Sequence, residues 1–200
     1  MKFVLASQNK GKLLEMQTIL SDLDVEICTL DQLGIRVDVE EDGKTFEENS
    51  LKKALAVMHK TGLPAIADDS GLCVEELGGA PGIYSARYGG DTAPTDTQRN
   101  ALVLQALRDQ SNRSAKFVCV VTCCFPIGMA LATRGECEGS IVFMPTGVDG
   151  FGYDSIFQPL GEKRTFAEMS SREKNAMSHR GNALRCFRKG LGEFLQTYYQ

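Results

Sequence analysis

The 200-residue sequence has no tryptophan, only two histidines and no long apolar run. With His59 and His179 alone, a metal site built from several imidazoles is excluded, and any bound cation would be held by carboxylate oxygens. No stretch approaches the roughly 20 apolar residues of a membrane-spanning helix. The start, MKFVLASQNKGK, has too short an apolar segment for a secretory signal. These absences favour a cytoplasmic protein without a membrane partner.

Paired cysteine motifs and excess positive charge are also missing. The seven cysteines are an odd number and show no C-x-x-C spacing, which argues against a disulfide framework or a zinc site. Most of them lie in apolar, strand-like runs, so we expect buried thiols that pack as small hydrophobic groups. The net charge of −4 argues against a general nucleic-acid-binding protein, which would show a basic surface.

What is present is typical of one globular domain: 42% of the residues are hydrophobic and 24% are charged. Residues 1–200 show no linker or internal repeat, and we expect a single domain with two lobes. Apolar periodicity predicts a mixed α/β sheet, because strands and helices alternate at the start and the middle is rich in strands. The expected strands are 2–6, 25–30, 63–67, 116–125 and 129–143, and the expected helices begin near residues 13, 46, 95 and 171.

Capping patterns mark two of these helices. Thr45 and Glu48 have the spacing of a capping box, and Gly62 is a fitting helix end. Ser170 and Glu173 repeat the pattern at the start of a C-terminal helix. Glycines 181, 190 and 192 predict that this last helix is interrupted.

Two adjacent aspartates, Asp68 and Asp69, follow the apolar run 63–67 and precede a segment rich in glycine. Successive side chains on a strand point in opposite directions, so one carboxylate can face a ligand while the other supports it. A carboxylate at the end of a strand, beside backbone kept slim by glycine, suits a magnesium ligand or a general base. The alternative is a simple Asp-Asp-Ser-Gly turn.

Four further segments carry groups that can bind a nucleotide. A polar turn before the first helix can bind phosphate through backbone N–H groups, although it lacks the P-loop spacing. Lys53 lies beside the apolar stripe of the second helix, where a solvent-exposed lysine is the alternative. An aromatic at Phe151 between glycines can stack on a base, and Arg180 carries only donors, which suits a purine 6-oxo oxygen or a phosphate. A core aromatic and a solvated helix face are the respective alternatives.

These segments, in this order, resemble the Ham1/RdgB-type inosine triphosphate pyrophosphatases. The resemblance rests on SQNKGK, the acidic loop with TFEEN, ADDSGLCVEELGGAPGIYSARYGG, FGYDSIF and TFAEMSSREKNAMSHRG, and it covers nearly the whole chain. It implies Mg²⁺-dependent hydrolysis of non-canonical purine nucleoside triphosphates (ITP, dITP and XTP) to the monophosphate and pyrophosphate. It also implies a homodimer of two-lobed α/β subunits, each with a long bent mixed sheet flanked by helices and a substrate cleft between the lobes.

The resemblance also assigns roles to residues. Asp69 resembles the proton acceptor and a magnesium ligand, assisted by Asp68 and by an acid of the Glu40-Glu41 pair. The triphosphate-binding groups correspond to Ser7, Gln8, Asn9, Lys10, Gly11, Lys12 and Lys53. The nucleoside-binding groups correspond to Ser70, Phe151, Gly152, Tyr153, Asp154, Lys174, His179 and Arg180, with Phe151 stacking on the base.

The sequence departs from the family pattern at three positions. Gln8 stands where many members have Gly or His, Cys73 replaces a small residue, and Ser155 replaces a common Pro, which we expect to loosen the loop around Phe151. Two other functions stay open: a nucleotide sensor or nucleic-acid-binding protein without catalysis, and a related pyrophosphatase for another modified nucleotide. The intact acidic set of Glu40, Glu41, Asp68 and Asp69 speaks against a sensor.

Overall fold

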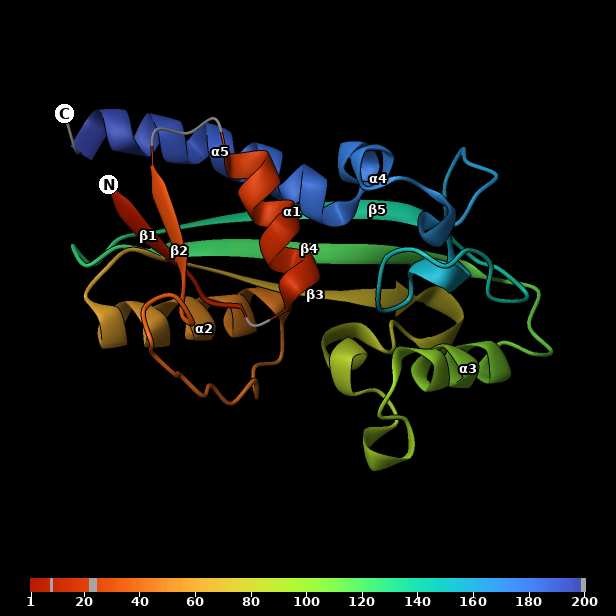
Figure 1. Cartoon of the computed structure of the whole chain (residues 1–200). Coiled ribbons are helices and arrows are strands. Elements are labelled where there is room, and N and C mark those ends of the chain that lie inside the picture. The colour runs from red at the N-terminus through yellow and green to blue at the C-terminus, as the bar shows by residue number, and fades with distance from the viewer. Residues whose placement is uncertain (8, 22–24, 199–200) are drawn as a thin grey trace. The chain divides into compact units, whose positions relative to one another are not determined.

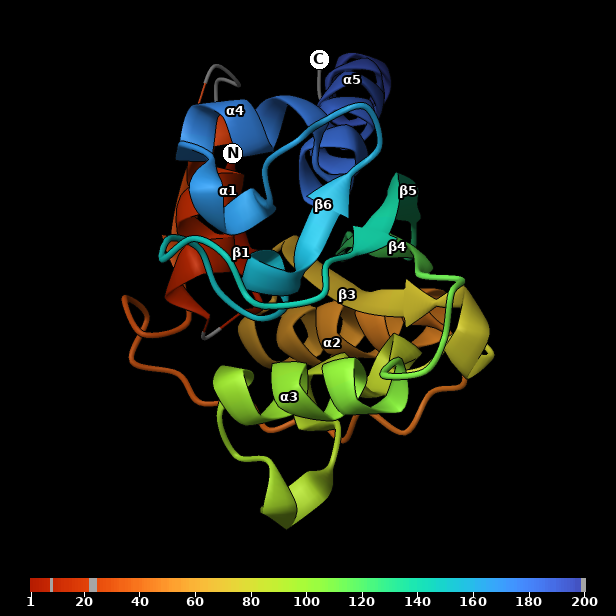
Figure 2. The same cartoon turned by 90° about the vertical axis from the view of Figure 1, so that its right-hand side faces the viewer.

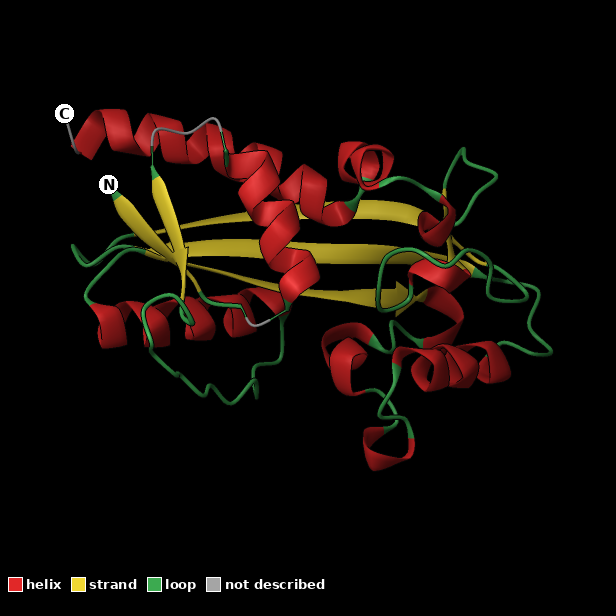
Figure 3. Cartoon of the chain, in the orientation of Figure 1, coloured by secondary structure: helices red, strands yellow, loops and turns green. Residues whose placement is uncertain are grey.

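The computed structural model describes residues 1–7, 9–21 and 25–198, so Gln8 lies outside the described residues. Its strands form one six-stranded sheet in the order β2-β1-β3-β4-β5-β6 (Figures 1 and 3). The strands are β1 (Lys2–Leu5), β2 (Glu26–Thr29), β3 (Ala65–Val74), β4 (Ser114–Cys124), β5 (Ala130–Ile141) and β6 (Phe157–Pro159). The α-helices are α1 (Lys10–Leu20), α2 (Phe46–Thr61), α3 (Asp96–Ala106), α4 (Ser171–Met177) and α5 (His179–Tyr198).

The sheet is mixed, which confirms the predicted α/β class. Strand β1 runs parallel to both β2 and β3. Strands β4 and β5 are neighbours joined by the short turn 125–129, so they run antiparallel, as the sequence predicts. The last strand, β6, pairs antiparallel with the end of β5 (Figure 2).

The chain forms two compact units. Unit 1 comprises Met1–Asp69, Cys119–Gly135 and Arg180–Gln200, and unit 2 comprises Ser70–Val118 and Glu136–His179. No helix within the described residues is long and apolar enough to cross a membrane.

Unit 1 has a hydrophobic core on each face of its part of the sheet. One core joins Phe3 and Ile66 to apolar side chains of α1 and α5, whereas the other joins Val4 and Ala67 to α2, which lies on the opposite face (Figure 1). This division follows from the alternation of side chains along β1 and β3. Each fully buried large side chain, such as Phe187 of α5, contributes about 2 kcal/mol of hydrophobic free energy.

Unit 2 has a core rich in aromatic side chains. The ring of Phe117 lies 4.7 Å from that of Phe157 and 6.0 Å from that of Phe166, measured between centroids. The buried cysteines contribute to all of these cores as expected: Cys28, Cys119, Cys123, Cys124 and Cys137 are buried.

Helix starts follow the predicted capping residues. Thr45 accepts the backbone N–H of Glu48 and Gly62 ends α2 in the left-handed conformation, although the Glu48 carboxylate accepts from the N–H of Lys44 and not from Thr45. Ser170 and Glu173 form a complete capping box at α4.

Two predicted boundaries are wrong. Strand β3 does not end before the aspartates but runs through them to Val74. The C-terminal helical segment breaks at Ser178, the extended C-cap of α4, and α5 then runs continuously through Gly190 and Gly192. His179 and Arg180 therefore begin a new helix and do not share the helix of Lys174.

Glycine 71 has a packing role in unit 2. A Cβ atom at this position would lie 2.2 Å from the carbonyl oxygen of Gly82 and 2.5 Å from Oγ of Ser85. Ser85 Oγ in turn accepts the N–H of Leu72 at 2.9 Å. The glycine thus lets the segment around Gly82 and Ser85 pack directly on β3.

Candidate active site

Asp68 and Asp69 point to opposite faces of β3, as the alternation predicts. Asp68 lies on the face of α1 and α5, where Lys12 Nζ is 3.0 Å and Arg180 Nη2 is 3.4 Å from its Oδ2. Asp69 lies on the face of α2, where Lys53 Nζ is 3.2 Å from its Oδ1 and the Asn49 amide donates to its Oδ2 at 3.2 Å. Both carboxylates are buried in unit 1.

The two surroundings shift the two acids in opposite directions. Burial opposes ionisation of Asp68, but the charges of Lys12, Arg180 and Lys53 outweigh it and hold the pKa well below its usual range. Burial raises the pKa of Asp69, and Glu41 adds to the rise, against the smaller opposing effects of Lys53 and Lys12. One carboxylate is thus a fixed anion, whereas its neighbour is the better proton acceptor.

Lys53 lies between two carboxylates. Its Nζ is 3.2 Å from Glu41 Oε1 as well as 3.2 Å from Asp69 Oδ1. Burial alone would lower the pKa of Lys53, but Asp69, Asp68 and Glu41 raise it, so the ammonium stays charged. The lysine that the sequence left open as a surface residue is therefore part of this acidic cluster.

These carboxylates are chemically suited to a hard cation. The structure places Glu41 and Asp69 around one positive charge, and it leaves Glu40 exposed. Within the described ranges, no group of three or more His, Cys, Asp or Glu side chains is arranged to hold a metal ion. Glu41 and Asp69 fit Mg²⁺ by donor type, because both present carboxylate oxygens where a cation already sits.

Asn49 was missed by the sequence reasoning. It is fully buried; its amide donates to Asp69, and its Oδ1 accepts the N–H of Gly43 at 2.8 Å. Asn49 thereby connects the acidic loop to the carboxylate. Asn49 lies in the TFEEN segment that carries the family resemblance, and this was the signal that could have identified it. A single sequence does not show that the Asn49 side chain faces Asp69.

The polar turn before α1 takes part through its helix N-terminus. Asn9 is the N-cap, and its Oδ1 accepts the N–H of Lys12 at 3.1 Å. The N–H of Asn9 donates to Ser7 Oγ at 3.2 Å. Lys10 is exposed, whereas Gly11 and Lys12 are partly buried. Such a helix start attracts anions.

Arg180 is held by a second carboxylate that the sequence analysis did not single out. Its guanidinium is 2% exposed, and Nη1 lies 2.5 Å from Glu15 Oε2 while Nη2 points to Asp68. Glu15 is itself buried on α1. The predicted base contact of Arg180 stays a prediction, and in this structure its terminal nitrogens face two acids.

In unit 2, Phe151, Asp154 and Lys174 form one cluster. Lys174 Nζ lies 2.8 Å from Asp154 Oδ2 and 4.5 Å from the centroid of the Phe151 ring. The same Oδ2 accepts the N–H of Phe151 at 2.8 Å. Gly150, with a φ of +79°, permits this close fold-back, since a Cβ there would lie 2.2 Å from Asp154 Oδ2.

The other predicted nucleoside-binding residues have varied surroundings. Tyr153 is buried and donates its hydroxyl to the carbonyl of Ser85 at 2.8 Å, so it is a core residue. The His179 ring stacks on Phe117 at 4.5 Å. Ser70 is partly buried on β3, and the N–H of Gly152 donates to Asp96 Oδ2 at 2.7 Å.

Ser155 connects its loop to α3, and the expected loosening of the loop around Phe151 stays a prediction. Its Oγ accepts the amide of Asn100 on α3 at 3.0 Å, and its carbonyl accepts the N–H of Thr146 at 2.9 Å. A proline could not supply the hydroxyl, so this serine adds a connection to the loop.

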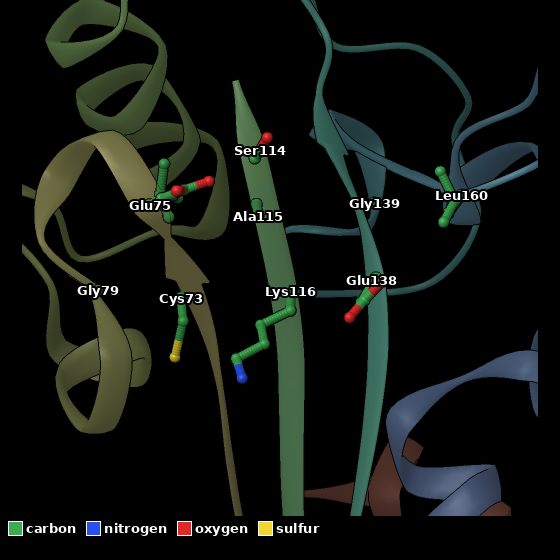
Figure 4. A pocket seen from close by; sticks show the side chains of 10 residues that line it. Cys73, Glu75, Gly79, Ser114, Ala115, Lys116, Glu138, Gly139 and Leu160 are labelled. Atoms are coloured by element: carbon green, nitrogen blue, oxygen red, sulfur yellow. The ribbon is translucent and has the colours of Figure 1, made fainter. Parts of the chain in front are cut away.

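A separate cavity of about 460 Å³ lies in unit 2 (Figure 4). Cys73 of β3, Ser114 and Lys116 of β4 and Glu138 of β5 line it, together with Leu160. None of the residues predicted to bind substrate is part of its lining.

Comparisons with known proteins identify the family of this chain. The model of the Ham1 family matches residues 3–190. The chain belongs to the Ham1 family. A dITP/XTP pyrophosphatase of Syntrophobacter fumaroxidans is 49% identical over 181 residues, covering 90% of this chain and 78% of the relative. The dITP/XTP pyrophosphatase of Geobacter sulfurreducens is 46% identical over 193 residues, covering 96% of each chain.

Solved structures of the family have the same fold. A Ham1 protein from Coxiella burnetii superposes with a TM-score of 0.89 at 45% identity, covering 96% of this chain and 99% of the other. The Staphylococcus aureus Ham1 protein gives a TM-score of 0.88 at 37% identity, with the same coverage. This Ham1-family chain therefore has the fold that its motifs imply.

Proposed function

We propose that this chain hydrolyses non-canonical purine nucleoside triphosphates, ITP, dITP and XTP, to the nucleoside monophosphate and pyrophosphate. The observation that carries the proposal is the placement of Asp68 and Asp69, which meet Lys12 and Arg180 on one face of β3 and Lys53 and Asn49 on the other. Hydrolysis needs a group that accepts a proton from the attacking water and positive charge that neutralises the phosphates. Relatives named dITP/XTP pyrophosphatase support the choice of substrate.

In this proposal, Asp69 accepts the proton of the attacking water. The water oxygen bonds to the α-phosphorus, the bond from that phosphorus to the bridging oxygen breaks, and pyrophosphate leaves with the electron pair. Lys12 and Lys53 bind phosphate oxygens, with the N–H groups at the start of α1. Mg²⁺, held by Glu41 and Asp69 with Glu40 nearby in sequence, would supply further neutralisation of phosphate charge.

The base is assigned to the unit 2 cluster. Phe151 offers an aromatic face for stacking. The ammonium of Lys174, a hydrogen-bond donor, lies 4.5 Å from the centroid of the Phe151 ring. Lys174 carries donors only, so it suits the 6-oxo oxygen of hypoxanthine and leaves the adenine amino group without a partner. An unpaired buried group of that kind costs about 1–3 kcal/mol. We further propose that the protein works as a cytoplasmic homodimer.

The test is pyrophosphate release from ITP, dITP, XTP, ATP and GTP, each with Mg²⁺ and with EDTA. We expect release from the first three with Mg²⁺, little release from ATP, and none with EDTA, whereas GTP, which shares the 6-oxo oxygen, shows whether a further group excludes guanine. Tight nucleotide binding without product would favour a sensor instead. If the protein releases pyrophosphate from none of the five but hydrolyses another modified nucleotide, it is a related pyrophosphatase with a different substrate.

A further inference from the structure

We propose that Glu15 is a positioning residue, which orients Asp68 by holding the guanidinium of Arg180. The inference rests on the proposed function, because the effect of Asp68 is read in pyrophosphate release. It concerns three elements of unit 1: α1 carries Glu15, α5 carries Arg180 and β3 carries Asp68.

The first step is the burial of the arginine. Arg180 is 2% exposed, and a guanidinium removed from water destabilises the fold unless opposite charge and hydrogen bonds compensate it. Glu15 Oε2 lies 2.5 Å from Nη1, and Asp68 Oδ2 lies 3.4 Å from Nη2. Because the guanidinium is planar, fixing one terminal nitrogen on Glu15 also fixes the direction in which the other meets Asp68.

The second step is the difference between the two cations that contact Asp68. Its Oδ2 contacts two cations: Lys12 at 3.0 Å and Arg180 at 3.4 Å. The Lys12 side chain is 18% exposed and lies at the start of α1, where phosphate is expected, whereas the Arg180 side chain is 2% exposed. When Lys12 turns to a phosphate, Arg180 is the cation that stays, and Glu15 keeps it in place.

The test measures Glu15→Gln in two backgrounds, wild type and Arg180→Met, by single-turnover and steady-state pyrophosphate release from ITP. A positioning role predicts that Glu15→Gln lowers kcat about tenfold in the wild type while KM changes by less than about threefold. In the Arg180→Met background the same change causes no further loss, because the residue through which Glu15 acts is already gone. The matched control is Glu47→Gln, which removes the charge from an exposed pair with Arg134 in the same unit and should leave kcat unchanged.

Unfolding midpoints provide a second readout that needs no activity. Arg180→Met leaves Glu15 buried without this cation, so adding Glu15→Gln should raise the Tm of that variant, whereas Glu15→Gln alone lowers the Tm of the wild type. If Arg180→Met fails to fold, Arg180→Lys replaces it as the background, since one ammonium cannot bridge both carboxylates in the same fork.

Two results overturn the inference: a kcat for Glu15→Gln equal to that of Glu47→Gln, or losses that multiply in the double variant. If the wild type releases no pyrophosphate from ITP, the proposed function fails. The Glu15–Arg180 pairing is then judged by Tm alone, and it is rejected if Glu15→Gln lowers the Tm equally in both backgrounds.

Discussion

Asp68 and Asp69 differ by one position along β3, and the charges that face them decide their chemistry. Asp68 meets Lys12 and Arg180 and is held as an anion, whereas burial dominates at Asp69 and favours the protonated form relative to an exposed aspartate. Two carboxylates in adjacent positions would repel each other if they shared one environment. The pleat of the strand separates them, so each can be tuned by its own neighbours.

Asp69→Asn is expected to lower pyrophosphate release from ITP by at least about 100-fold, because an amide cannot accept the proton of the attacking water. The amide fits the space of the carboxylate, so the Tm should stay close to that of the wild type. Asp42→Asn is the control, since Asp42 is an exposed partner of Lys52 outside the acidic cluster. Near-normal turnover by Asp69→Asn would exclude Asp69 as the base.

The sequence was informative about single side chains and much less informative about their partners. Asp68, Asp69, Lys12 and Lys53 stand out because charges flank apolar runs, and the structure brings each of them to a counter-charge. The pairing of Glu15 with Arg180 joins residues 165 positions apart, and one sequence carries no sign of such a contact.

At the scale of elements, caps were predicted well and breaks were predicted poorly. Ser170 and Thr45 each accept a backbone N–H only three residues further along the chain, so the sequence alone predicts these helix caps. Gly190 and Gly192 suggested an interruption, since each glycine costs about 1 kcal/mol in a helix. Long-range packing of Phe187 and Leu191 into the unit 1 core stabilises α5 against this cost.

The N-terminus of α4 should be sensitive to acid. Hydrogen bonds from Ser170 and Arg164 lower the pKa of Glu173 to about 2. Because the pKa of Glu173 is lower in the folded state than its ordinary value of 4.5, the ionised carboxylate stabilises the folded protein above about pH 4.5. This stabilisation is lost as the pH falls toward about 2. Glu173→Gln should therefore have a lower Tm than the wild type at pH 7, and the gap should narrow at pH 3.5. A gap that stays constant between the two pH values would contradict this assignment.

Gly71→Ala tests the close packing on β3. The new methyl group would meet the backbone carbonyl of Gly82, which cannot move as a flexible side chain can, so we expect a loss of roughly 1–3 kcal/mol. Gly192→Ala is the matched control: its Cβ meets nothing within 4 Å and lies in α5, so it should be neutral or stabilise by up to about 1 kcal/mol. Urea unfolding measures both, and equal shifts for the two variants would refute the packing role of Gly71.

At the scale of the whole molecule, the α/β class and the mixed sheet could be predicted from alternating periodicities. The extent of β3 could not, because Ser70 and Gly71 have the composition of a turn. In the structure these residues are part of an interior strand of the sheet, and Gly71 packs against the segment around Gly82 and Ser85, neither of which one sequence makes visible.

The proposed homodimer can be tested by measuring the mass of the protein in solution. Light scattering during size exclusion should give twice the chain mass of 21.9 kDa, independent of nucleotide. With a net charge of −4, the protein should also show no salt-dependent binding to duplex DNA in the same buffer. A mass equal to that of one chain at micromolar concentration would rule out a stable dimer.

The pleat that separates the two aspartates has a consequence for insertions and deletions. Adding or removing one residue between Ala65 and Asp68 turns every later side chain of the strand to the other face. Asp68 and Asp69 would then each point to the other face of the sheet, although every residue of the site would still be present. A change of length in this part of the chain is therefore expected to abolish pyrophosphate release even though every side chain of the site is kept.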